Sequence, residues 1–135
     1  MAPLRRTQGA LGAFVIVGRL GGEEFAMLLP GRDLEGGRAI AERLREEIMA
    51  VRLPLADKIV VFTSSFGVSE WKAGESVDDM LRRADMALYS AKAAGRNRVI
   101  AAGDEAPAPD DYQSAERPLR TAQRAHISAV PRSAA

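Results

Sequence analysis

Apolar residues cluster in short runs near the start of the chain, and two of these runs flank a pair of glycines. The first run, residues 14–17, is rich in β-branched residues and predicts a strand. The second run, residues 25–29, predicts a partner strand that ends at Pro30. Gly21 and Gly22 lie between the runs and suit a tight connection with positive φ, so the pattern predicts a β-hairpin.

A helical period follows the hairpin. Asp33 is a suitable N-cap for this first helix. Apolar residues then recur at helical spacing, at Ile40, Leu44, Ile48 and Val51. Because the charged residues of this stretch fall largely off that face, one side of the helix is predicted to pack on a sheet.

A second helix is predicted further along the chain. Ser76 and Asp79 form a variant capping box, S-x-x-D, which marks its start. Gly95 is suitably placed for the C′ residue beyond its end. The stripe that is expected to face the core consists of Val77, Leu81, Ala84, Leu88 and Ala91.

Three more segments have strand character. Residues 59–63 predict a strand, and residues 66–71 predict another that either continues it or hairpins back from it. Residues 98–101 are suited to a closing edge strand. The elements together predict a mixed α/β fold over roughly residues 12–101, which forms the first of two regions, residues 1–101.

The second region, residues 102–135, is rich in alanine and proline. It holds four of the seven prolines, among scattered charges. Such a composition cannot bury enough apolar surface to offset the entropy cost of ordering. We therefore predict a disordered C-terminal tail, with a transient helix near residues 120–127.

Composition narrows the classes of function. The chain has 135 residues, enough for one domain with a modest core, and a formal net charge of +1, which favours neither nucleic acid nor an anionic membrane as a partner. It contains no cysteine, which excludes disulfides and thiolate metal sites. The apolar stretch at residues 11–17 is far shorter than the ~20 residues of a membrane-spanning helix. We expect a soluble, cytoplasmic protein without a membrane segment.

The tip of the predicted hairpin, RLGGEEF, places two carboxylates side by side, Glu23 and Glu24. Adjacent like charges raise each other's pKa, and a neighbouring cation reverses that balance. Mg²⁺ favours one or two carboxylates, with waters and substrate phosphates completing its shell, and glycines allow a nucleotide to approach the main chain. The tip is therefore suited to metal-assisted phosphoryl chemistry. For GGEE alone, a solvated acidic loop is the simpler interpretation.

Two cations lie at the end of the second predicted helix. Lys92 and Arg96 are four residues apart and share a face if the last turn stays helical. Cations at a helix C-terminus are stabilised by ~0.3–1 kcal/mol through the helix dipole, which explains them without any ligand. The functional alternative is that both side chains reach a phosphate group, with arginine supplying a fork and lysine a point charge.

Three blocks, RLGGEEF, TSSFGVS and ADMALYSAKAAGRNRV, follow one another along the chain. In order and spacing they resemble the signature blocks of the GGDEF domain, the catalytic domain of bacterial diguanylate cyclases, over roughly residues 15–100. The resemblance implies a sheet like the palm of nucleotide cyclases and polymerases, with flanking helices. It also implies a signalling transferase that condenses two GTP molecules into cyclic di-GMP and releases pyrophosphate. In this family two domains form a homodimer, each holds one GTP, and each 3′-hydroxyl attacks the other's α-phosphate.

The resemblance also implies roles for the residues of the hairpin tip. Gly21 and Gly22 match glycines that lie against the nucleotide. Glu23 matches a Mg²⁺ ligand that is also proposed to help deprotonate the 3′-hydroxyl. Glu24 matches a glutamate associated with the metal and the active-site network. Both acids are thus the expected catalytic and metal-binding residues, with Mg²⁺ as the cofactor.

The resemblance extends to the cations and to what precedes the hairpin. Lys92 and Arg96 match residues that contact the GTP phosphates. Family members also carry an upstream strand and helix that supply a further Mg²⁺-binding aspartate and recognise guanine, but no Asp or Glu precedes Glu23 here. We therefore expect residues 1–101 to be a partial GGDEF domain, truncated at its N-terminus and without an upstream sensor domain.

Three interpretations of function stay open. The chain is a diguanylate cyclase-type domain, or it is a degenerate remnant that is catalytically inactive and binds nucleotide weakly or acts through protein contacts. The third is a structural or interaction fragment with no nucleotide function. The intact hairpin tip with Lys92 and Arg96 favours the first, and the absent upstream aspartate favours the second.

Overall fold

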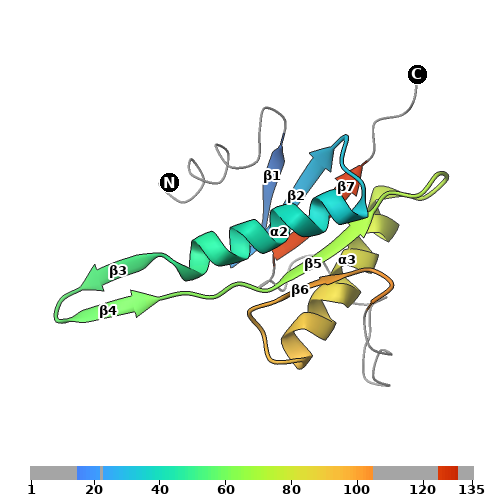
Figure 1. Cartoon of the computed structure of the whole chain (residues 1–135). Coiled ribbons are helices and arrows are strands. Elements are labelled where there is room, and N and C mark those ends of the chain that lie inside the picture. Colours follow the sequence, from blue (N-terminus) through green and yellow to red (C-terminus); the bar gives the residue numbers. More distant parts are fainter. Residues whose placement is uncertain (1–14, 22, 105–124, 131–135) are drawn as a thin grey trace.

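The computed structural model describes residues 15–21, 23–104 and 125–130, which form a five-stranded sheet and a separate two-stranded hairpin with two helices (Figure 1). The elements in chain order are β1 (Ile16–Gly21), β2 (Glu24–Pro30), α2 (Leu34–Met49), β3 (Arg52–Leu55), β4 (Lys58–Val61), β5 (Phe66–Glu70), α3 (Val77–Ala93), β6 (Val99–Ala101) and β7 (Ala125–Val130). The predicted α/β fold, a palm-like sheet with flanking helices, is confirmed. No helix in this part of the chain is both long and apolar enough to span a membrane.

The main sheet has the strand order β1-β2-β7-β5-β6. β1 runs antiparallel to β2, as the predicted hairpin requires, while β2, β7, β5 and β6 run parallel to one another. Phe25, Ala125, Phe66 and Val99 therefore lie on one row across the four parallel strands. We call the end of the sheet where these four strands begin the leading end, and the other the carboxyl end.

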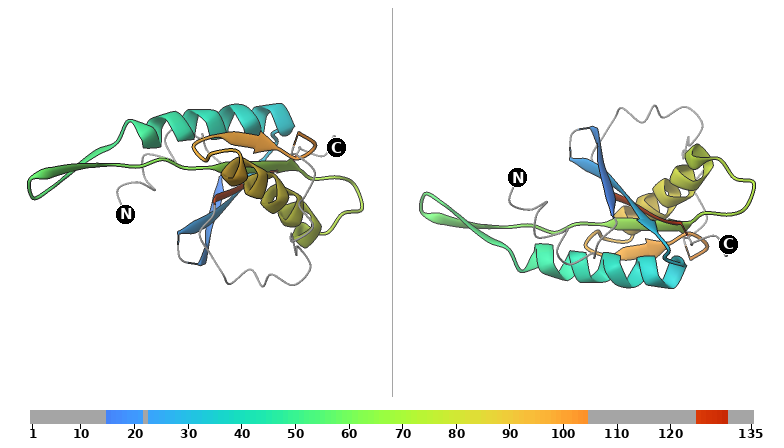
Figure 2. Two further views of the ribbon diagram at one scale, coloured as in Figure 1. Left: turned by 90° about the horizontal axis from the view of Figure 1, so that it is seen from below. Right: turned by 90° about the horizontal axis from the view of Figure 1, so that it is seen from above.

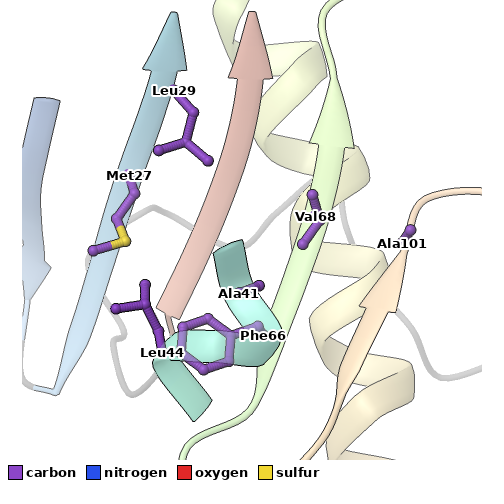
Figure 3. Close-up of a cluster of buried hydrophobic side chains, with 7 residues drawn as sticks. All are labelled: Met27, Leu29, Ala41, Leu44, Phe66, Val68 and Ala101. Carbon is purple, nitrogen blue, oxygen red and sulfur yellow. The ribbon is translucent and has the colours of Figure 1, made fainter. Parts of the chain in front are cut away.

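The helices cover opposite faces of the sheet (Figure 2). The face beneath α2 carries the main hydrophobic core, which Figure 3 shows in close-up. Its buried members are Met27, Leu29, Ala41, Leu44, Phe66, Val68 and Ala101. Asp33 caps α2 as predicted, since its carboxylate accepts a hydrogen bond from the Gly36 amide at 2.7 Å.

The other face of the sheet meets α3. Residues 66–69 are all buried, because successive strand residues point to opposite faces and both faces of β5 are covered. A Cβ built on Gly67 would lie 2.0 Å from the Ala84 carbonyl oxygen and 2.4 Å from the Leu88 amide nitrogen of α3. The Ser69 hydroxyl donates to the Met80 carbonyl of the same helix at 2.7 Å. α3 therefore rests directly on the backbone of β5.

The start and end of α3 agree with the prediction, but its buried stripe differs in part. Ser76 caps the helix and its hydroxyl bonds reciprocally with Asp79, and Gly95 follows the helix end with φ of +118°. Val77, which was expected in the core, is 56% exposed, because the first turn of α3 precedes the part that packs on the sheet. The buried residues are Met80, Ala84, Ala87, Leu88 and Ala91.

β7 occupies the centre of the sheet. All six of its residues pair with β2 on one side, and the first five pair with β5 on the other. The sequence pattern predicted a transient helix near residues 120–127 and no strand here, whereas Ala125–Val130 forms a strand because β2 and β5 offer it two parallel edges and its backbone pairs with both. Residues 105–124 and 131–135 of the predicted tail lie outside the described residues.

A hairpin of β3 and β4 projects from the body of the molecule (Figure 1). The predicted strand at residues 59–63 corresponds to β4. It pairs with β3 and not with the following strand, because β5 pairs with β6 and β7 in the main sheet. Apolar side chains of this arm and its base are exposed, namely Val51, Leu53, Leu55, Ile59, Val61 and Phe62.

The contact at Gly67 gives a test of the packing of α3. We expect Gly67→Ala to lower the free energy of unfolding by about 3 kcal/mol, because the added methyl group would displace the helix backbone. Gly18→Ala is the matched control, since no atom lies within 4 Å of a Cβ built there. Urea unfolding of both variants measures the difference, and equal stabilities would contradict the packing described.

The central position of β7 gives a second test. Ile127 pairs with Met27 and Val68, so Ile127→Pro would remove a backbone donor from a strand flanked on both sides. We expect a loss of about 3 kcal/mol in the free energy of unfolding. Ile127→Val keeps the amide and should cost about 1 kcal/mol or less. A similar small effect of both substitutions in thermal unfolding would mean that this segment does not complete the sheet.

Candidate functional site

The hairpin tip lies at the leading end of the sheet, where β1 ends and β2 begins. Gly21 is the last residue of β1, and the pairing with β2 is irregular between Arg19 and Gly21. Gly22 lies outside the described residues. The register of the hairpin therefore shifts at the first glycine of the tip.

The two acidic residues of the tip have different surroundings. Glu23 lies in the turn and is exposed, so its carboxylate is accessible to a ligand. Glu24 is the first residue of β2 and is only 4% exposed. Buried carboxylates require partners, and Glu24 does interact with the surrounding structure. The pair therefore divides into an outward acid and an inward acid.

Lys92 and Arg96 lie near the end of α3 but not on one helical face. α3 ends at Ala93, and Lys92 is half-buried in its last turn. Arg96 follows in a turn with φ of +63° and is exposed. The condition for a shared face, a helix that continues through Arg96, is not met, because Gly95 ends the helix as the predicted C′ residue, with a positive φ.

The topology brings the acidic tip and the basic turn to the same end of the sheet. Glu24 directly precedes Phe25, and Arg96 comes three residues before Val99, which lies on the same row of the sheet. Three strand spacings separate β2 from β6, which is about 14 Å at ~4.8 Å per strand. α3 packs on β5, β7 and β6, so its C-terminal end lies over the strands between the acidic tip and the basic turn. The two motifs thus flank one end of the sheet.

Sequence reasoning missed the residues that hold the basic turn. The Asn97 amide donates to the Ser65 hydroxyl at 3.1 Å, and the Asn97 carboxamide oxygen accepts from Arg45 of α2 at 3.0 Å. The one signal in the sequence that could have identified Asn97 is that it directly follows Arg96. Arg45 could not be found from spacing, because it lies on another element.

The donor set of the site suits a metal that takes most of its ligands from a substrate. Within residues 15–21, 23–104 and 125–130, no three His, Cys, Asp or Glu side chains gather into a metal-binding group. Two adjacent carboxylates are nevertheless enough for Mg²⁺ when phosphate oxygens and waters complete the shell. Glu23 and Glu24 fit that limited set, and their roles stay predictions.

A separate cleft of about 460 Å³ lies at the carboxyl end of the sheet, between the starts of the two helices. Two of its charged groups, Arg83 and Glu70, serve the fold. Arg83 donates to both carboxylate oxygens of Glu75 at 2.8 and 2.7 Å, and the Glu70 carboxylate accepts from the Leu34 amide at the start of α2 at 3.0 Å. Because these charges are engaged in structural bonds, we do not take this cleft as the functional site.

Comparisons with known proteins bear on this arrangement. A family profile described as "Diguanylate cyclase, GGDEF domain" matches residues 6–98. Diguanylate cyclase DgcP of Pseudomonas aeruginosa is 42% identical over 83 residues, which cover 62% of this chain and 12% of that protein. Diguanylate cyclase DgcM of Escherichia coli is 42% identical over 87 residues, covering 64% of this chain and 20% of that protein.

A third relative is described as a regulator. Response regulator PleD of Caulobacter vibrioides is 38% identical over 85 residues, which cover 61% of this chain and 19% of that protein. This chain therefore spans a fifth or less of these three relatives. The similarity concerns one region of each relative.

The Arg83–Glu75 pair generates a prediction about pH. The hydrogen bonds from Arg83 hold the pKa of the Glu75 carboxyl below its ordinary value of about 4.5. A carboxylate whose pKa is lowered by folding stabilises the protein above its ordinary pKa, and this contribution is lost as the pH falls through the folded-state value. We expect Glu75→Gln to lower the free energy of unfolding at pH 7 by about 1 kcal/mol and to flatten its decline below pH 4.5. Urea unfolding from pH 3 to pH 7 measures both effects, and an unchanged acid decline would contradict the assignment.

Proposed function

Because the chain belongs to the GGDEF domain family of diguanylate cyclases, we propose that the leading end of its sheet binds GTP and that two such domains condense two GTP molecules into cyclic di-GMP. The observation that carries the proposal is that the acidic tip and the basic turn lie at the same end of the sheet. This juxtaposition supports a single site for a metal-bound triphosphate. With GTP as the substrate, the domain would act in the cytoplasm.

The acidic tip provides the metal-binding part of the proposed site. Glu23, which is exposed, binds the ion directly, while Glu24 holds the tip in place and supplies the second carboxylate. Bound Mg²⁺ would neutralise phosphate charge and polarise the α-phosphate. Gly21 and Gly22 leave room for the nucleotide beside the main chain. Glu23 also accepts the proton of the attacking 3′-hydroxyl.

The basic turn provides the phosphate-binding part. Lys92 and Arg96 bind the β- and γ-phosphates and stabilise the leaving pyrophosphate, the first as a point charge and the second as a fork. In each half-reaction the 3′-oxygen of one GTP forms a bond to the α-phosphorus of the other. The α–β phosphoanhydride bond breaks, and pyrophosphate leaves. Two such steps close the ring, which is why the proposal includes a homodimer with one GTP per domain.

One observation favours a second candidate, a domain that binds nucleotide without turnover. β7, at the centre of the sheet, carries no Asp or Glu. The resemblance to the family leads us to expect a metal-binding aspartate on an additional strand, and β7 does not provide it. With fewer carboxylates, binding of GTP through Lys92 and Arg96 would survive better than catalysis.

Incubation of the full chain with GTP and Mg²⁺, followed by mass spectrometry of the products, tests the proposal. We expect cyclic di-GMP from the parent chain and a loss of about 100-fold or more in Glu23→Gln, because the carboxylate is replaced by a neutral amide. Glu47→Gln is the matched control, since Glu47 is an exposed residue of α2 that pairs with Arg43.

The outcomes separate the two candidates. Product formation that is lost in Glu23→Gln and kept in Glu47→Gln supports the cyclase. GTP binding by calorimetry without product supports the binding domain. Neither binding nor product would refute both and leave a fragment with a structural role.

A further inference from the structure

The turn that carries Arg96 has an uncommon backbone. Gly95, Arg96 and Asn97 have φ of +118°, +63° and +46° in succession. Residues other than glycine rarely adopt positive φ, although asparagine does so more often than most. Two such residues in a row persist only where the surrounding structure holds them.

Backbone bonds hold the first half of the turn to α3. The Arg96 amide donates to the Ala91 carbonyl at 3.0 Å, and the Gly95 amide donates to the Lys92 carbonyl at 3.2 Å. Arg98 folds back so that its Nε donates to the Arg96 carbonyl at 3.0 Å. The Arg96 side chain is exposed and has no polar partner within the described part of the chain. The backbone of Arg96 is thus fixed while its guanidinium stays available.

The second half of the turn is held by Asn97, which is bonded from two other elements. Its amide donates to the hydroxyl of Ser65, just before β5, at 3.1 Å. Its carboxamide oxygen accepts from Arg45 at 3.0 Å, and its carboxamide nitrogen lies 3.4 Å from the sulfur of Met49. Arg45 and Met49 both belong to α2. Asn97 therefore links the end of α3 to the last turns of α2 and to the start of β5.

The Arg45 guanidinium bonds to two partners at once. Its side chain is 17% exposed, and its Nε donates to the Glu42 carboxylate at 2.9 Å while its Nη1 donates to Asn97. A guanidinium can make both bonds at once because its donors are fixed in a plane. A lysine ammonium at this position would offer the charge without the fork.

We infer that Arg45 is a positioning residue, which acts through Asn97 to keep Arg96 aimed at the nucleotide phosphates. The inference rests on the proposed function. It adds a residue of α2 to a site otherwise built from the hairpin tip and α3. Ser65 supports the same asparagine from the β5 side.

Calorimetric titration of the full chain with GTP and Mg²⁺ tests the role of Arg45. We expect Arg45→Ala to raise the Kd for GTP about tenfold, because the cation turn loses its fixed orientation. Arg45→Lys should recover part of the affinity, with a Kd about threefold above that of the parent. The matched control is Arg43→Ala, which removes a 65% exposed arginine of the same helix that pairs only with Glu47 among the described residues. Its Kd should equal that of the parent.

A double substitution separates positioning from general destabilisation. Asn97→Ala should raise the Kd by a factor similar to that of Arg45→Ala. The double variant should bind GTP no more weakly than either single variant, because each substitution removes the same hydrogen bond between Arg45 and Asn97. All titrations are made at a temperature well below the midpoint of thermal unfolding of each variant. If Arg45→Ala does not fold, Arg45→Lys and Asn97→Ala provide the same comparison.

The outcomes keep the inference and the proposed function apart. A parent chain that does not bind GTP would overturn the proposed function and the positioning role with it. A parent that binds GTP, with equal Kd for the Arg45 and Arg43 variants, would overturn the positioning role alone. Multiplicative effects in the double variant would likewise overturn it, since Arg45 and Asn97 would then act separately.

Discussion

The direct contact between α3 and the backbone of β5 sets the geometry on which the rest of the molecule depends. Gly67 presents no side chain to the helix, and the space for a Cβ is taken by the backbone of Ala84 and Leu88. Ser69 fixes the same helix further along through its bond to Met80. With its distance and direction set in this way, α3 can end only above the leading end of the sheet. The location of Lys92 and of the turn behind it therefore follows from a packing constraint in the middle of the strand.

Local patterns were sufficient for most elements and insufficient for pairing over long distances. The hairpin, the caps at Asp33 and Ser76 and the helix end at Gly95 all depend on neighbours within a few residues, and the sequence predicted them correctly. β7 could not be predicted, because six residues of ordinary composition become a strand only when two distant strands offer their edges. The exposure of Val77 was missed because a helical stripe does not show where the sheet beneath it begins.

The same contrast between local patterns and long-range contacts applies to the candidate site. The acidic tip and the cations were found from motifs, since each lies within one short block of sequence. The support of the basic turn was not found, because Arg45, Ser65 and Asn97 lie on three segments that only the fold brings together. A binding residue can be recognised from its own neighbours in the chain, whereas the residues that orient it are neighbours only in space. The predicted ligands and the unpredicted supports are thus two parts of one arrangement.

The projecting arm of β3 and β4 exposes apolar side chains, yet one of its long edges is poorly suited to adding further strands. The turn at Ala56-Asp57 joins Leu55 and Lys58, which form a register pair. The pair that closes a two-residue hairpin is of the hydrogen-bonded kind, so the next pair, Pro54 and Ile59, is of the non-bonded kind. The nitrogen of Pro54 then faces outward, where a neighbouring strand would need a donor that proline does not have. The β3 edge consequently resists growth into an extended intermolecular sheet, although the side chains around it are apolar.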